Sequence, residues 1–150
     1  MSNFKKIFIT GGCGFIGSHI SEYFFNKYKD SKIIIYDKMT YAAHISNIKN
    51  ILKDKRVELI KEDICDFDTL KKYTKGTDLL IHAAAESHVD KSFFLREEFL
   101  KTNVIGTKNV MEVSLKNNIQ NIVHMSTDEV YGEISKGKFD ENSPLNPTNP

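Results

Sequence analysis

Short apolar runs rich in β-branched residues recur along the chain, and segments of mixed polar and apolar character separate them. Runs of this kind are typical of buried strands in a parallel sheet that helices cover on both faces. The pattern predicts five strands, which run from Lys6 to Thr10, Lys32 to Tyr36, Val57 to Lys61, Leu79 to Ala83 and Asn121 to Met125.

The segments between the predicted strands favour helices. The first helix begins near Phe15, and its apolar face carries Ile16, Ile20, Tyr23 and Phe24. Further helical segments are predicted from Ile45 to Leu52, from Asp66 to Tyr73 and from about Phe93 to Lys116. This alternation predicts an α/β protein with a doubly wound, Rossmann-like parallel sheet of strand order 3-2-1-4-5. Ligands bind such sheets at the carboxyl ends of the strands, where the strand order reverses.

Composition and charge narrow the class of protein. The 150 residues suffice for one domain with a sizeable core, and the formal net charge is +1 without a basic block. Nucleic acid and membrane surfaces are therefore not expected partners. No apolar stretch approaches the ~20 residues of a membrane span, and no signal peptide precedes the first strand. Cys13 and Cys65 lack metal-ligand spacing, so we expect a reduced, cytoplasmic protein without a metal site.

A glycine-rich loop, TGGCGFIGSHI, follows the first predicted strand. Gly11 suits a tight turn, Gly14 leaves room for a pyrophosphate beside the backbone, and Gly17 permits close packing of helix on strand. The N–H groups of Phe15 and Ile16 would meet the phosphates at the positive end of the helix. A flexible turn without a ligand is the alternative interpretation of the glycines.

Two acids close the next two strands. Asp37 stands 20 residues after Gly17, where an acid accepts hydrogen bonds from an adenosine ribose. It would repel a 2′-phosphate and so favours NAD over NADP, although the neighbouring Lys38 weakens that preference slightly. Asp63 and Ile64 could line the adenine. A solvated acid at position 37 and a helix cap at position 63 are the alternatives.

The fourth predicted strand ends in small residues. Ala83, Ala84 and Ala85 would leave room for a cofactor across the sheet edge, although small residues serve tight helix packing equally well. Glu86 and Ser87 follow within reach of a ligand. His82 is interpreted as a satisfied core histidine without a role. Cys13, in the glycine loop, has no base beside it and is expected to be a small loop residue rather than a nucleophile.

Two neighbouring carboxyl groups, Asp128 and Glu129, follow the fifth strand. They lie beside the expected ligand edge and could supply acid–base chemistry. Ser126 to Glu129 also has the S-x-x-E pattern of a capping box, with acids at the positive end of a helix. Gly132 follows so soon that only about one turn of helix could be capped.

Six segments carry a family resemblance. They are ITGGCGFIGSH, YDKMTYA, KEDICD, HAAAESHVDKS, TNVIGT and HMSTDEVYGE, in this order. Together they resemble the extended short-chain dehydrogenase/reductase family and, within it, the nucleoside-diphosphate-glucose 4,6-dehydratases. The likeness spans nearly the whole chain, although the glycine motif alone marks only the superfamily. Ala83 and Ala43 depart from the usual family pattern without touching the chemistry.

The resemblance implies NAD as cofactor and a nucleotide sugar, dTDP-glucose or UDP-glucose, as substrate. The implied NAD contacts are Phe15, Ile16, Asp37, Lys38, Met39, Thr40, Asp63, Ile64, Ala83, Ala84, Ala85, Glu86, Ser87 and Thr102. Ser87 and Thr127 would contact the sugar nucleotide. Asp128 would be the general acid and Glu129 the general base, with Thr127 beside them in the catalytic set.

The implied reaction is redox-neutral. A hydride leaves C4 of the glucosyl unit, water is eliminated across C5 and C6, and the hydride returns to C6 to give the 4-keto-6-deoxy sugar of rhamnose-type pathways. Elimination needs one ionised carboxylate to remove the acidic C5 proton and one protonated carboxyl to release the C6 hydroxyl. Adjacent acids tend to titrate apart, but their coupling prevents assignment of either proton from sequence.

The family pattern continues past PTNP with Tyr-x-x-x-Lys, which would lie after Pro150. The resemblance therefore implies that residues 1–150 form the NAD-binding domain, without the last strands or the nucleotide-sugar domain, and are inactive alone with weak NAD binding at best. The full-length lyase is expected to dimerise through the helix from Thr102 to Lys116. Alternatives are a UDP-glucose dehydratase, a 4-epimerase, which the two acids disfavour, and an inactive NAD-binding module.

Overall fold

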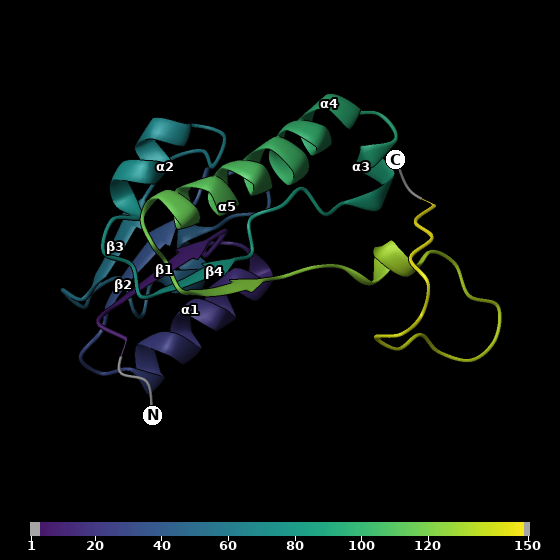
Figure 1. Ribbon diagram of the computed structural model, residues 1–150. Coiled ribbons are helices and arrows are strands. Elements are labelled where there is room, and N and C mark those ends of the chain that lie inside the picture. The colour runs from purple at the N-terminus through teal and green to yellow at the C-terminus, as the bar shows by residue number, and fades with distance from the viewer. Residues whose placement is uncertain (1–3, 149–150) are drawn as a thin grey trace.

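The computed structural model describes residues 4–148 and contains one parallel sheet with helices on both faces (Figure 1). The strand order is β3-β2-β1-β4-β5, as predicted. The strands are β1 Lys6–Thr10, β2 Lys32–Tyr36, β3 Val57–Ile60, β4 Leu79–His82 and β5 Asn121–His124. The last three each end one residue before the predicted boundary.

The helices lie in or beside the predicted segments, with three differences. The segment predicted from Ile45 to Leu52 is a 3₁₀ turn that ends at Ile48, a separate short helix precedes the long segment predicted from about Phe93, and a π-helical stretch lies inside that long segment. The α-helices are α1 Phe15–Lys27, α2 Phe67–Tyr73, α3 Val89–Ser92, α4 Arg96–Phe99 and α5 Thr107–Lys116. Two 3₁₀ turns are η1 Ile45–Ile48 and η3 Asp128–Tyr131, and a π-helical segment is η2 Leu100–Gly106. Because η2 joins α4 to α5, one continuous helical run replaces the single α-helix predicted from about Phe93.

The two faces of the sheet are covered by different helices. Figure 1 shows α1 on one face and α2 with α5 on the other. In β1, Ile7 and Ile9 pack into the cluster beneath α1, whereas Phe8 packs with Leu70 of α2 and Val110 of α5. Fully burying an aliphatic side chain stabilises the fold by about 1.5–3 kcal/mol. Because β1 buries side chains on both faces of the sheet, it is a main contributor to the stability of the fold.

Strand register aligns the ends that carry the candidate site. Thr10 at the end of β1 pairs with Tyr36 of β2 on one side and with His82 of β4 on the other. His82 in turn pairs with His124 at the end of β5. The loops that follow these strands therefore all leave the same edge of the sheet.

The chain after β5 runs beyond the edge of the sheet (Figure 1). It returns on itself, because Asn146 donates its backbone N–H to the Val130 carbonyl at 3.0 Å. Gly132 has φ +79°, and a Cβ there would lie 2.1 Å from the Asn146 carbonyl oxygen, so this turn requires glycine. Asn149 and Pro150, the end of the PTNP motif, lie outside the described residues. Within residues 4–148 no helix has the length and apolar character needed to cross a bilayer.

Candidate cofactor and acid–base site

The glycine loop has the geometry that the sequence predicts. Gly11 takes the left-handed region with φ +70° and donates its N–H to the Tyr36 carbonyl at 2.9 Å. A Cβ at Gly17 would lie 2.0 Å from the Gly11 carbonyl oxygen, whereas a Cβ at Gly14 would meet only that oxygen, at 3.4 Å. Gly17 is thus required for the close approach of α1 to the loop, and Gly14 leaves open space beside the backbone.

The N-terminus of α1 is available to an anion. The helix begins at Phe15, and its N-cap, Gly14, has no side chain to accept the first-turn N–H groups. These groups have no partner inside a helix, and the helix dipole adds positive potential there. A phosphate beside Gly14 would accept hydrogen bonds from these N–H groups and would lie in the positive potential of the dipole. The backbone geometry therefore fits a pyrophosphate.

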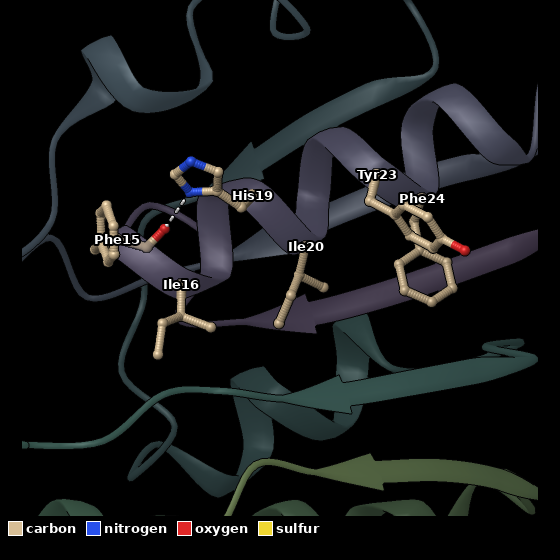
Figure 2. Close-up of a pocket in the computed structure, with 6 residues that line it drawn as sticks. All are labelled: Phe15, Ile16, His19, Ile20, Tyr23 and Phe24. Atoms are coloured by element: carbon tan, nitrogen blue, oxygen red, sulfur yellow. Dashed lines mark hydrogen bonds between the residues drawn. The ribbon is translucent and has the colours of Figure 1, made fainter.

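The side chains of the first α1 turns form a separate, apolar feature. Figure 2 shows a shallow groove, here the α1 groove, lined by Phe15, Ile16, His19, Ile20, Tyr23 and Phe24. Ile20 and Phe24 pack against the core, but Ile16 is 58% exposed and Tyr23 54%. The predicted apolar face of α1 is therefore only partly buried. Because the groove lining is almost entirely apolar, phosphates fit the helix backbone rather than this groove.

Asp37 lies buried at the end of β2, only 7% exposed. Its Oδ2 accepts the N–H of Cys13 in the glycine loop at 2.8 Å, and its Oδ1 accepts the N–H of Met39 at 2.8 Å. Each carboxylate oxygen can accept a further hydrogen bond, so ribose hydroxyls remain possible partners. Met39 has φ +60°, which is uncommon for a residue with a side chain and marks a constrained loop.

The Cys13 thiol is not activated as a nucleophile. Burial and the neighbouring Asp37 charge raise the pKa of its thiol to about 12. The thiol stays protonated at neutral pH, which agrees with its interpretation as a small loop residue.

Lys38 and Asp63, two predicted cofactor contacts, form an ion pair of 2.9 Å. Partial burial opposes ionisation of Asp63, but hydrogen bonds from Lys38 and Cys65 outweigh it and lower the pKa of Asp63. The Lys38 charge is thereby compensated, so it should offset the predicted preference of Asp37 for NAD less than the sequence indicates. Asp63 does not cap α2, because that role belongs to Asp66, which accepts the Thr69 N–H at 3.1 Å.

A buried hydrogen-bond chain fixes the start of the loop after β4. The Thr10 hydroxyl accepts the N–H groups of Ala83 and Ala84, at 3.2 and 3.3 Å, and lies 2.7 Å from His82 Nδ1. Because its oxygen accepts from two amides, its proton is free to donate to Nδ1. His82 Nε2 therefore carries the ring proton and donates to the Thr107 hydroxyl at 3.0 Å. His82 is a satisfied core histidine, as predicted, but it also joins the loop to α5.

The pKa of His82 has a consequence for acid stability. Burial, and secondarily the charge of His124, lower the pKa of His82 from its ordinary value of 6.5 to about 4. Between these two values the unfolded chain binds a proton that the folded protein does not, so the free energy of unfolding falls as pH drops from 6.5 to 4, by up to about 3 kcal/mol. Above pH 6.5 this contribution is fully present.

Urea unfolding at several pH values tests this prediction. In His82→Gln an amide can accept from Thr10 and donate to Thr107 but does not titrate, so we expect a shallower loss of stability in this window than in the wild type. Equal pH dependence of the two proteins would show that His82 is not held neutral by the fold.

The middle of the same loop is held by a residue that sequence reasoning missed. Asn103 Oδ1 accepts the Glu86 N–H at 2.8 Å, and Asn103 Nδ2 donates to the Glu86 carbonyl at 2.9 Å. Asn103 lies in η2 beside Thr102, a predicted NAD contact. Asn103 belongs to the TNVIGT segment, which is part of the family resemblance. The sequence alone does not indicate which polar side chain of that segment faces the loop.

Asp128 and Glu129 occupy the single 3₁₀ turn η3 and are both exposed. The turn is capped by Thr127, whose hydroxyl accepts the Glu129 N–H at 3.2 Å. The capping-box alternative, which placed the cap at Ser126, was therefore wrong by one residue, although the prediction of about one turn was correct. The turn is tied to the sheet because Met125 donates its N–H to the His82 carbonyl at 2.9 Å.

The predicted residues form two groups along one sheet edge. The glycine loop, Asp37 and the Ala83–Ser87 loop are connected by the hydrogen bonds given above, whereas η3 lies apart from the start of α1 (Figure 1). Among residues 4–148 no group of three or more His, Cys, Asp or Glu side chains is placed to hold a metal ion.

A parallel sheet whose first strand leads through a glycine loop into a helix, and whose second strand ends in a buried acid, defines a dinucleotide-binding α/β domain. The family model described as GDP-mannose 4,6 dehydratase matches residues 8–150. The chain belongs to this family.

Individual relatives agree with the family assignment. A dTDP-D-glucose 4,6-dehydratase from Dictyostelium discoideum is 38% identical over 97% of this chain, which covers 37% of that protein. The crystal structure of DesIV, a dTDP-glucose 4,6-dehydratase from Streptomyces venezuelae with NAD bound, has a TM-score of 0.90 at 38% identity, over 96% of this chain and 46% of its own.

The fold alone does not distinguish reactions within this group. The UDP-Glc/GlcNAc 4-epimerase of Campylobacter jejuni has a TM-score of 0.87 at 28% identity, over 97% of this chain and 44% of its own. The chain thus spans less than half the length of each of these three proteins.

Proposed function

We propose that the protein is an NAD-dependent lyase that converts dTDP-glucose to dTDP-4-keto-6-deoxyglucose. The observation that carries this proposal is the pair of adjacent carboxyl groups, Asp128 and Glu129, in the turn that follows β5 of a dinucleotide-binding sheet. The Dictyostelium relative and DesIV, both dTDP-glucose 4,6-dehydratases, support it.

The residues at the strand ends suit NAD. The uncapped N-terminus of α1 and the space beside Gly14 would hold the pyrophosphate, and Asp37 would bind the adenosine ribose. Asp63 and Ile64 would border the adenine, and the Ala83–Ser87 loop with Thr102 would border the nicotinamide half. DesIV, crystallised with NAD, supports this cofactor.

Bound NAD would supply oxidation at C4 of the sugar and reduction at C6. The residues of this chain would carry the elimination between those steps. Glu129 as base would remove the C5 proton once C4 is a ketone, and Asp128 as acid would protonate the departing C6 hydroxyl. Thr127 and Ser87 would position the sugar nucleotide. A 4-epimerase breaks no C–O bond and has no need of this acid and base, so Asp128 and Glu129 favour dehydration.

The proposal also includes a homodimeric assembly and a cytoplasmic location. Leu100, Val104 and Leu115 are exposed apolar residues on the α4–η2–α5 run, which supports a homodimer formed through this helix. Cys13 and Cys65 are free thiols, which suits a cytoplasmic protein.

Titration of NAD and NADP into residues 1–150 tests the cofactor part directly. We expect NAD to bind weakly but at least tenfold more tightly than NADP, a difference of about 1.4 kcal/mol, because a 2′-phosphate would face the Asp37 carboxylate. Asp37→Asn should weaken NAD binding and narrow this difference, whereas the exposed Asp30→Asn should change neither. Equal affinity of the wild type for both dinucleotides would refute the assigned role of Asp37.

A further inference from the structure

The loop from Ala83 to Ser87 is attached at two points to one helical run. At its start, Thr10 and His82 connect it to Thr107, the first residue of α5. At Glu86, Asn103 binds both the N–H and the carbonyl of a single residue. An amide that engages both groups of one residue restrains the two peptide units on either side of it.

The π-helical segment η2 carries this amide and packs against a second loop. Gly106, at the end of η2, packs so closely that a Cβ would lie 2.5 Å from Ile64 Cδ1. The helical run therefore contacts the loop after β3 through Gly106 and the loop after β4 through Asn103. A π-helix holds an additional residue per turn and is frequently found at functional sites.

Besides these bonds, the loop is ordered by the packing of Ala84 against the core and by the interaction of the Glu86 side chain with Tyr41. Ala83, Ala84 and Ala85 offer one methyl group each for packing, and Ser87 is exposed. Its backbone conformation therefore depends largely on hydrogen bonds, and the bidentate bond from Asn103 restrains its middle.

We propose that Asn103 is a positioning residue for NAD binding, which holds the Ala83–Ser87 loop in its binding conformation through the backbone of Glu86. This inference rests on the proposed NAD site. A loop that is already ordered loses less conformational freedom on binding, so removal of the Asn103 amide weakens affinity without removing any group that touches the cofactor.

Asn103→Ala and Asn117→Ala, made in the protein expressed from its complete reading frame, form a matched pair of variants. Asn117 lies just after α5 and likewise makes two hydrogen bonds, in this case donating to the Lys71 carbonyl and the Thr74 hydroxyl, at 2.9 and 2.8 Å, away from the candidate site. We expect both variants to lower the melting temperature to a similar extent. Only Asn103→Ala should raise the dissociation constant of NAD, about tenfold, and only it should increase hydrogen exchange of the Glu86 amide. Asn103→Ser, which keeps a shorter polar group, should lie between wild type and Asn103→Ala.

The measurements separate this inference from the proposed function. If the wild type binds NAD and Asn103→Ala binds it as tightly as Asn117→Ala does, the positioning role is overturned. Unchanged exchange of the Glu86 amide in Asn103→Ala overturns it as well, whatever the affinity. Absence of NAD binding by the wild-type protein expressed from its complete reading frame overturns the proposed NAD site, and this inference with it.

Discussion

Replacing Asp128 by Asn, or Glu129 by Gln, should lower the rate of nucleotide-sugar dehydration by about 10²–10⁴-fold, the usual contribution of general acid–base catalysis. Asn cannot protonate the departing hydroxyl, and Gln cannot accept the C5 proton. Both residues are exposed on η3, away from the glycine loop, so NAD affinity and the melting temperature should stay unchanged. Product formation from dTDP-glucose by the protein expressed from its complete reading frame measures the effect.

Glu133→Gln provides the control for this pair, because Glu133 is an exposed acid four positions after Glu129. It should dehydrate the substrate at the wild-type rate. Undiminished dehydration by Asp128→Asn or by Glu129→Gln would remove that residue from the catalytic assignment.

Gly17→Ala should both destabilise the domain and abolish NAD binding. The added Cβ would lie 2.0 Å from the Gly11 carbonyl oxygen, which is a backbone atom. Because the Cβ position is itself fixed by the backbone of α1, the helix and the loop must move apart. Overpacking typically costs about 1–3 kcal/mol, and a clash with backbone belongs at the upper end of that range. Urea unfolding and NAD titration of residues 1–150 would measure both effects.

Gly14→Ala separates stability from binding at the same loop. Its Cβ would meet only the Gly11 carbonyl oxygen, at an ordinary 3.4 Å, so the free energy of unfolding should hardly change. The methyl group would nevertheless stand where the pyrophosphate approaches, and NAD affinity should fall at least tenfold, or about 1.4 kcal/mol. If Gly17→Ala unfolds at the wild-type urea concentration, or Gly14→Ala retains wild-type affinity, the structural account of the loop is wrong.

The fold was predictable because the strands and the glycine loop are each specified by residues that are close together in the sequence. Runs such as Ile33 to Ile35 are buried on both faces of β2, and such continuously apolar strands are typical of a parallel sheet that helices cover on both faces. The strand order followed from the right-handed crossovers. The glycine loop was predictable for a related reason, because Gly11 and Gly17 meet steric demands that few other residues satisfy.

The features that sequence reasoning missed depend on contacts between distant residues. Thr10 and Thr107 lie 72 and 25 positions from His82, so no periodicity links the three. Within the π-helical segment Asn103 meets Glu86 and Gly106 lies against Ile64, whereas the apolar spacing of the segment indicates only a helix. Likewise, the spacing in α1 identifies an apolar face but not that Ile16 and Tyr23 stay exposed on the α1 groove.

The most direct test of the proposed function follows a deuterium label through the reaction. The protein from its complete reading frame is incubated with NAD and dTDP-glucose deuterated at C4, and the product is examined by NMR, with UDP-glucose deuterated at C4 as a parallel substrate. The account predicts dTDP-4-keto-6-deoxyglucose with deuterium at C6, and little product from the UDP sugar. A C4 epimer that keeps deuterium at C4, or recovery of unchanged substrate, would contradict it.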